Sequence, residues 1–179
     1  MRHWLATWMV VAMAGGTWAA TLEQLGFDEM VEKSTAIVRG RVAGSYTTSK
    51  GSLIYTHYRV LVSERWKGPA TTEADLVVPG GALASVRQSF PGAPKLSQGS
   101  DYVLFLWTAK SGLTHIIGLT QGLFNVKTDA TGATVASRGA SGETMLDRTT
   151  GKPVNEETLS LSMAELNTRI SRAMSGAGK

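Results

Sequence analysis

Apolar and polar residues alternate with a period of two along much of the middle of the chain. In segment 36–42, Val38 and Val42 share one face, and Arg39 and Arg41 share the other. This alternation is typical of a half-buried strand, and a continuous apolar run indicates a strand that is buried on both faces. The pattern predicts seven strands, at about residues 36–42, 54–62, 75–78, 102–107, 114–119, 123–127 and 133–137. The polar stretch 47–52 predicts the loop of a hairpin between the first two strands.

Two segments carry the signals of a helix start. Thr21 is followed three residues later by Gln24, and Ser162 by Glu165, which is the pattern of a capping box. Apolar residues follow each pair at helical spacing. The sequence therefore predicts one helix at each end of a β-barrel, at about residues 22–33 and 163–174.

The first twenty residues have the pattern of a signal peptide. Arg2 gives a positive start, residues 4–14 form an apolar run, and residues 15–20 end in small side chains. The apolar run is shorter than the roughly 20 residues that span a bilayer. We therefore expect cleavage after Ala19 or Ala20, export to the periplasm or the medium, and no stable membrane insertion of the mature chain.

The remainder, about 160 residues, has the size of one domain with one core. We expect three parts: a signal peptide at 1–20, a β-barrel with its N-terminal helix at 21–137, and a linker with the C-terminal helix at 138–179. The chain has no cysteine, which excludes disulfides, thiolate metal sites and a cysteine nucleophile. The net charge of +4 is spread along the chain without a basic run, so nucleic acid is not an expected partner.

Sequence patterns for catalysis and cofactor binding are missing. His57 and His115 are isolated on predicted strands, without neighbours at metal-ligand spacing. There is no G-x-S-x-G run, and the pair Gly151-Lys152 lacks the other residues of a phosphate-binding loop. We therefore expect no catalytic residue, no cofactor and no metal.

Two surfaces are candidates for partner binding, and the first consists of basic side chains. Arg39, Arg41, His57 and Arg59 lie on the polar faces of two strands that we expect to pair, so they bring four donors toward an anionic partner. The alternative is a charged outer face that keeps the barrel soluble. We favour this alternative, because like charges opposite each other destabilise a hairpin.

The second candidate surface is the loop from Gly80 to Gly99. Long ordered loops are uncommon in compact domains and often carry binding. Phe90 is the candidate apolar contact, and Pro91 and Pro94 stiffen the chain beside it. The alternative, which we favour, is that Phe90 turns inward and caps the barrel.

Short motifs along the chain resemble two groups of known proteins. The first set of motifs comprises Ala36–Val42, Tyr58–Val62, Trp66–Pro69, Gly99–Phe105 and Gly122–Phe124. Their order resembles the inhibitory domain of tissue inhibitors of metalloproteinases, a netrin-like OB-fold barrel. The second set comprises Pro79–Gly81, Pro91–Pro94, Val103–Leu106 and Gln121–Phe124, and it is similar to a series in exported bacterial proteins of unknown function. The animal inhibitors place an N-terminal cysteine on the zinc of the protease, so that mechanism and its residues do not transfer to a chain without cysteine.

The sequence thus predicts an exported, mainly β protein, an OB-like barrel of five to seven strands with an N-terminal and a C-terminal helix. The expected function is a non-enzymatic binding module whose partner is a protein or peptide, ahead of a glycan. A metalloprotease is the most specific version of that partner. The alternatives are a hydrolase that uses Asp75, Asp101 or Asp129, and a structural role in the cell envelope.

Overall fold

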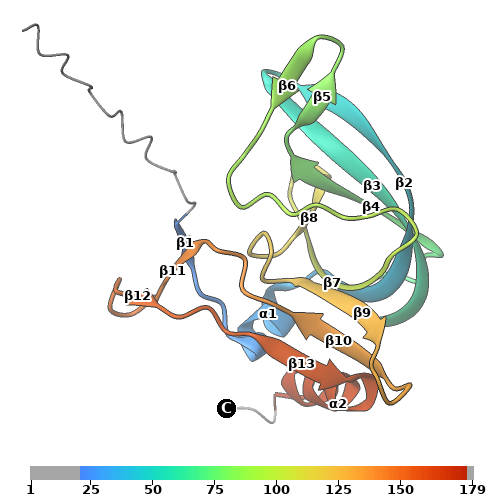
Figure 1. Ribbon diagram of the computed structural model, residues 1–179, viewed down its shortest axis with the longest axis vertical. Helices are drawn as coiled ribbons and strands as arrows, with labels where there is room; N and C mark the ends of the chain where they lie inside the picture. Colours follow the sequence, from blue (N-terminus) through green and yellow to red (C-terminus); the bar gives the residue numbers. More distant parts are fainter. Residues whose placement is uncertain (1–20, 177–179) are drawn as a thin grey trace, which may run out of the picture.

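A computed structural model describes residues 21–176, so the predicted signal peptide lies outside the described residues. The fold is mainly β, with two helices (Figure 1). The elements are β1 (Thr21–Glu23), α1 (Phe27–Lys33), β2 (Ala36–Lys50), β3 (Leu53–Lys67), β4 (Glu73–Pro79), β5 (Gly81–Leu83), β6 (Val86–Gln88), β7 (Asp101–Thr108), β8 (Thr114–Ile116), β9 (Leu123–Thr128), β10 (Thr134–Arg138), β11 (Thr144–Leu146), β12 (Pro153–Val154), β13 (Leu159–Ser162) and α2 (Met163–Met174).

The main sheet forks at β7. One edge of β7 pairs with β2, while its other edge pairs with β9 through residues 102–104 and with β8 through residues 106–108. Strands β2, β3, β4, β8 and β7 therefore close into a ring, in which only the contact between β4 and β8 is parallel. Strands β9, β10 and β13 continue the sheet outward from the other branch. A mainly β chain with two helices and a strand ring is confirmed.

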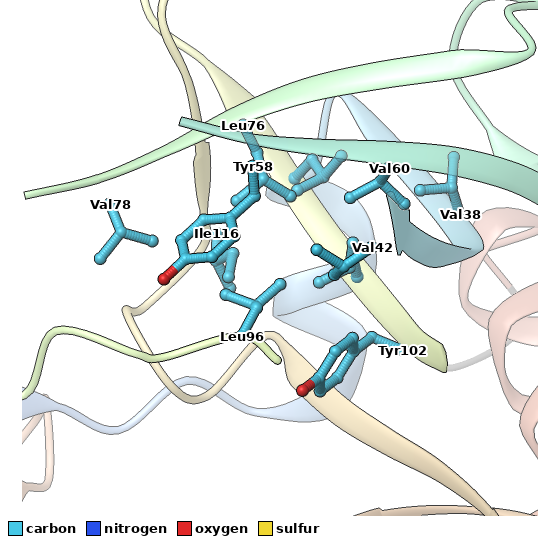
Figure 2. Packing of buried hydrophobic residues seen from close by; sticks show 11 residues of the cluster. Val38, Val42, Tyr58, Val60, Leu76, Val78, Leu96, Tyr102 and Ile116 are labelled. Carbon is cyan, nitrogen blue, oxygen red and sulfur yellow. The ribbon is translucent and has the colours of Figure 1, made fainter. Parts of the chain in front are cut away.

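The two faces of β7 contact two separate hydrophobic cores, where the sequence suggested one. The ring core fills the inside of the ring and is shown in Figure 2; it consists of Val38, Val42, Tyr58, Val60, Leu76, Val78, Leu96, Tyr102, Leu104, Leu106 and Ile116. The helix core lies between the sheet and both helices and consists of Met30, Val31, Ile37, Val103, Phe105, Phe124, Ala136, Leu161, Leu166 and Ile170. Alternate residues of β7 belong to alternate cores, which explains why this strand is apolar throughout.

The strands of the long hairpin extend further than the sequence predicted. β2 continues through the polar stretch as far as Lys50, and the turn to β3 consists of Gly51 and Ser52 alone. Three register shifts between β2 and β3 mark bulges, which bend a sheet toward closure. Gly40 lies at one of them, and a Cβ atom there would come within 2.5 Å of the Leu61 carbonyl oxygen. β8 is shorter than predicted and ends at Ile116, because the chain turns over the next six residues.

The predicted N-terminal helix is wrong in its first turns. Thr21–Glu23 form β1, which pairs in parallel with β11, and the Gln24 amide donates to the Leu146 carbonyl. The second contact uses the Gln24 amide, which a capping box would have satisfied. α1 instead begins at Phe27, after Gly26, which makes no side-chain cap.

The C-terminal helix is confirmed at both ends. The Ser162 hydroxyl accepts from the Glu165 amide, and the Glu165 carboxylate accepts from the Ser162 amide, so the capping box is complete. Leu166 and Ile170 are fully buried in the helix core, where Leu161 also packs. Strands β11, β12 and β13 lie in the segment that we interpreted as a linker, and β13 pairs with β10 in the main sheet.

None of the helices among residues 21–176 has the length and apolar character needed to cross a membrane. Within the same range, no three histidine or carboxylate side chains converge in a way that would hold a metal ion.

Candidate functional site

The loop from Gly80 to Gly99 folds back over one end of the ring. It contains the β5–β6 hairpin, which lies beside the ends of β2 and β3 at the top of Figure 1. The Gln88 side chain fastens this hairpin: its Oε1 accepts from the Ile54 amide at 2.7 Å, and its Nε2 donates to the Ser52 carbonyl at 2.6 Å. Further along, Leu96 inserts into the ring core. The loop is therefore an ordered part of the barrel end.

Two glycines make the sharp entry into this loop possible. Gly80 and Gly81 have φ values of 100° and 138°, which side-chain-bearing residues rarely adopt. A Cβ atom on Gly81 would lie 2.6 Å from Thr56 Oγ1 and 2.8 Å from Thr47 Cγ2. The backbone of β5 thus passes directly over the hydroxyl-bearing ends of β2 and β3.

Between the loop and the ring lies a hollow of about 270 Å³, which we call the mouth pocket. Its residues come from β3, β4 and the loop: Thr56, Tyr58, Val78, Pro79, Gly80, Gly81, Ala82, Arg87, Gln88, Ser89, Phe90, Ala93, Pro94 and Lys95. The lining combines apolar side chains, hydroxyl groups and two exposed cations, Arg87 and Lys95. It contains no aspartate or glutamate.

Tyr58 connects the mouth pocket with the ring core. Only 9% of its surface is exposed, and its ring packs among the aliphatic side chains of the core. Figure 2 shows its hydroxyl at the edge of this group, pointing away from Val60. The residue lines the pocket, and no hydrogen bond joins its hydroxyl to another group among residues 21–176; the hydroxyl is not one of the fully buried atoms without a partner, so it is reachable from the hollow. A hydroxyl in this position is available to a ligand.

The three predicted loop contacts have different environments. Phe90 is half-buried, lines the pocket and lies against Gly80, but it belongs to neither hydrophobic core. Pro94 is buried and lines the same pocket, whereas Pro91 is exposed. Two of the three residues therefore surround one hollow.

The predicted basic side chains on β2 are each engaged with a carboxylate. Arg39 Nη1 donates to Glu64 Oε1 at 2.6 Å. Arg41 donates to both oxygens of Asp101, at 3.0 Å and 2.9 Å, in a bidentate ion pair. The guanidinium of Arg41 lowers the pKa of the Asp101 carboxyl below its usual value. These pairs reduce the attraction of this face for an external anion.

His57 belongs to a different cluster further along the same hairpin. Its Nδ1 lies 2.9 Å from Asp75 Oδ1, and its Nε2 lies 2.9 Å from Thr48 Oγ1. The Tyr46 ring stacks on the imidazole at 4.5 Å, and its hydroxyl donates to Asp75 Oδ2 at 2.6 Å. Arg59 is opposite Asp75 in the register of β3 and β4. The four predicted basic residues therefore divide between two ion pairs and this histidine cluster.

Sequence reasoning missed the partners of His57. Tyr46 and Thr48 were placed at the hairpin loop or at its border, whereas the strand continues past them and sets Tyr46 directly opposite His57. The order Asp75–His57–Thr48 is that of an orienting carboxylate, a base and a hydroxyl. Thr48 lies near the C-terminal end of β2, and neither Thr48 nor His57 lines the mouth pocket.

The other carboxylates considered for catalysis have structural contacts. Asp101 is held by Arg41, as described above. Asp129 Oδ1 accepts from the amides of Thr131 and Ala133 and from the Thr131 hydroxyl, and these hydrogen bonds order a turn. They also lower the pKa of Asp129. His115 lies apart from both and contacts the rings of Trp107 and Tyr55, and burial lowers its pKa.

Comparison of the chain with protein-family models, curated proteins and solved structures found no match.

Proposed function

We propose that the protein is an exported, non-enzymatic binding module with an OB-like barrel, and that its partner is a protein or peptide. The closed ring of five strands supports the OB-like assignment, because OB barrels are five-stranded Greek-key barrels that bind ligands on strands and loops. The proposed likeness to netrin-like domains rests on the sequence motifs. A shared fold gives only an analogy for function, so the proposal depends mainly on the mouth pocket.

The mouth pocket is the observation that supports this function most strongly. It is a concave site that combines apolar and aromatic walls with a few polar groups, as binding sites do. The loop above it is pinned at Gln88 and Leu96, so little conformational entropy is lost when a partner docks. A glycan remains the second class of partner, and a structural envelope role would leave the pocket without a purpose.

The proposal can be tested by capturing a partner from the envelope and culture fluid of the producing organism. Deleting the whole loop would also remove Leu96 from the ring core, so charge reversal is the better change. We expect the double variant Arg87→Glu/Lys95→Glu to lose a reproducible partner that the wild type retains. The matched control reverses two exposed cations away from the pocket, Lys127→Glu and Arg169→Glu. Equal retention by all three proteins would refute binding at the mouth.

A metalloprotease is the most specific partner within this proposal. Purified protein would be incubated with metalloproteases secreted by the same source, and complex formation and the rate of cleavage would be measured. A complex that the double variant fails to form is the expected result. No complex and no change in rate would remove this version while leaving other peptides as partners.

A hydrolase is the second candidate, because Asp75, His57 and Thr48 form consecutive hydrogen bonds in the order that activates a hydroxyl nucleophile. Ester hydrolysis by the wild type would be compared with Thr48→Val, His57→Gln and the exposed control Thr128→Val. Ester hydrolysis that Thr48→Val and His57→Gln abolish and Thr128→Val retains would support a hydrolase. Equal rates for the wild type and the three variants would exclude a hydrolase at this cluster.

A further inference from the structure

We infer that the mouth pocket recognises a carboxylate, namely the C-terminal carboxylate of a peptide whose last side chain is apolar. This inference rests on the proposed function and specifies its ligand. It follows from three features of the pocket: the sign of its charges, the free Tyr58 hydroxyl, and its size.

The charges of the pocket all have one sign. Arg87 and Lys95 stand on the exposed side of the lining, and no carboxylate accompanies them there. This differs from the outer face of β2, where Glu64 and Asp101 neutralise the arginines. Two cations without a counter-charge in the lining favour an anionic ligand.

The Tyr58 hydroxyl supplies the fixed donor deeper in the site. The surrounding core holds the ring in place, and the hydroxyl has no partner within residues 21–176. A carboxylate has two acceptor oxygens, so one can meet the tyrosine while the other faces a cation. The hydroxyl and the two cations can all donate hydrogen bonds to an anion. None of them carries a negative charge that would attract a cationic ligand.

The size and walls of the pocket fit one residue at the end of a chain. A hollow of about 270 Å³ lies below the range of roughly 300–1,000 Å³ that holds a drug-sized ligand. Val78, Phe90 and Pro94 provide apolar walls for a terminal side chain. Capture of a C-terminal carboxylate is a known mode of peptide recognition.

The test measures the affinity of purified protein for three small peptides by calorimetry or NMR titration. The first is N-acetyl-alanyl-leucine with a free carboxylate, the second is its amide, and the third is an amidated peptide with an internal glutamate. We expect the free acid to bind at least roughly tenfold more tightly than either amidated peptide, because charge-assisted hydrogen bonds are lost. Affinity for the acid should fall as salt is raised.

Variants of the pocket identify the groups responsible. Tyr58→Phe retains the ring and removes only the hydroxyl, and Lys95→Gln removes one cation. Each change should lower the affinity for the free acid severalfold and leave the affinity for the amide unchanged. Lys127→Gln on β9 is the exposed control and should change nothing. Melting curves of each variant show whether the fold is retained.

The outcomes separate this inference from the proposed function. Equal binding of acid and amide, or no binding of the acid, overturns carboxylate recognition. Partner capture that still depends on Arg87 and Lys95 would then keep the mouth as a binding site for another ligand. Preference for internal glutamate over the terminal carboxylate would likewise overturn the C-terminal assignment.

Discussion

The helix core and the mouth pocket lie on opposite sides of the molecule and are built differently. Both helices lie at the bottom of Figure 1, and the β5–β6 hairpin lies at the top. In the helix core, Phe105, Phe124 and Ile170 are fully buried among apolar side chains, and the buried Arg138 guanidinium lies on the face of Phe124. At the mouth, the Tyr58 hydroxyl makes no hydrogen bond to another group within residues 21–176, and Gly80 and Gly81 stand where side chains would not fit. The comparison contrasts a fully packed core with a hollow that has polar groups in its lining, and our proposal places the ligand at the hollow.

The largest expected effect comes from removing a ring of the helix core. Phe124 is fully buried, and its ring lies 5.5 Å from that of Phe105, with the Arg138 guanidinium 5.3 Å away on its face. Phe124→Ala should lower the free energy of unfolding by about 3–5 kcal/mol, measured by urea denaturation. The half-buried Phe90 is the matched ring at the mouth, and Phe90→Ala should cost about 1 kcal/mol or less. Equal costs would contradict the division between the two sides.

A methyl group at the entry to the loop should have the next largest effect. Gly81→Ala places a Cβ atom against Thr56 and Thr47 at an unfavourable φ, which should cost about 1–3 kcal/mol and shift the amide resonances of the mouth. Gly44 has open space around its Cβ position and an ordinary φ. Gly44→Ala is therefore the control, and an equally large loss there would show that strand glycines matter for another reason.

Loss of the cap of α2 should lower the free energy of unfolding by less, because the cap adds hydrogen bonds to a helix that is already held by packing. Ser162→Ala removes the acceptor for the Glu165 amide and should cost about 1 kcal/mol in thermal or urea unfolding. Ser171 is exposed within the same helix, so Ser171→Ala should be close to neutral. A neutral Ser162→Ala would mean that β13 and the buried leucine side chains fix the helix start on their own.

The smallest effect concerns pH and lies outside the mouth. Burial raises the pKa of Glu143, with Glu156 adding to the shift. A carboxyl whose pKa is higher in the folded state stabilises the fold below its unfolded pKa and loses that contribution as pH rises toward its folded pKa. Glu143→Gln should therefore raise the melting temperature slightly at neutral pH and have no such benefit under acidic conditions.

The pKa of Asp101 is shifted in the opposite direction to that of Glu143, so Asp101 serves as the comparison. Its pKa is lowered by Arg41, so its contribution is present above the unfolded pKa and is lost as pH falls through the lower folded value. Asp101→Asn should reduce the melting temperature at neutral pH and converge with the wild type in acid. If both variants shifted in the same direction with pH, the assignments of cause would be wrong.

Local signals in the sequence predicted the parts of the fold that depend on local contacts. α2 begins at the predicted residue because Ser162 and Glu165 satisfy each other within one turn. The start of the first helix was predicted wrongly because the backbone of Thr21–Glu23 pairs with Thr144–Leu146. This partner strand is far along the chain, and the local sequence pattern does not predict the pairing. Alternation likewise identified β2 and β3 but placed their turn too early.

The site was less accessible to prediction for the same reason. Phe90 and Pro94 were expected to act together, and both line the mouth pocket. Their combination with Tyr58 depends on a loop that crosses the end of the ring, and its course follows from Gln88 bonding to the opposite hairpin. The Asp75–His57–Thr48 cluster depends on the register of β2, β3 and β4, and this register involves two connections, at residues 51–52 and 68–72.

The most direct test of binding at the mouth is to map amide chemical shifts of the isotope-labelled protein during titration with N-acetyl-alanyl-leucine. We expect saturable shifts confined to the ends of β3 and β4 and to residues 80–95, with none in α1 or α2. Shifts centred on the helices or on the outer face of β2, or no shifts at saturating peptide, would contradict the assignment of the mouth as the binding end.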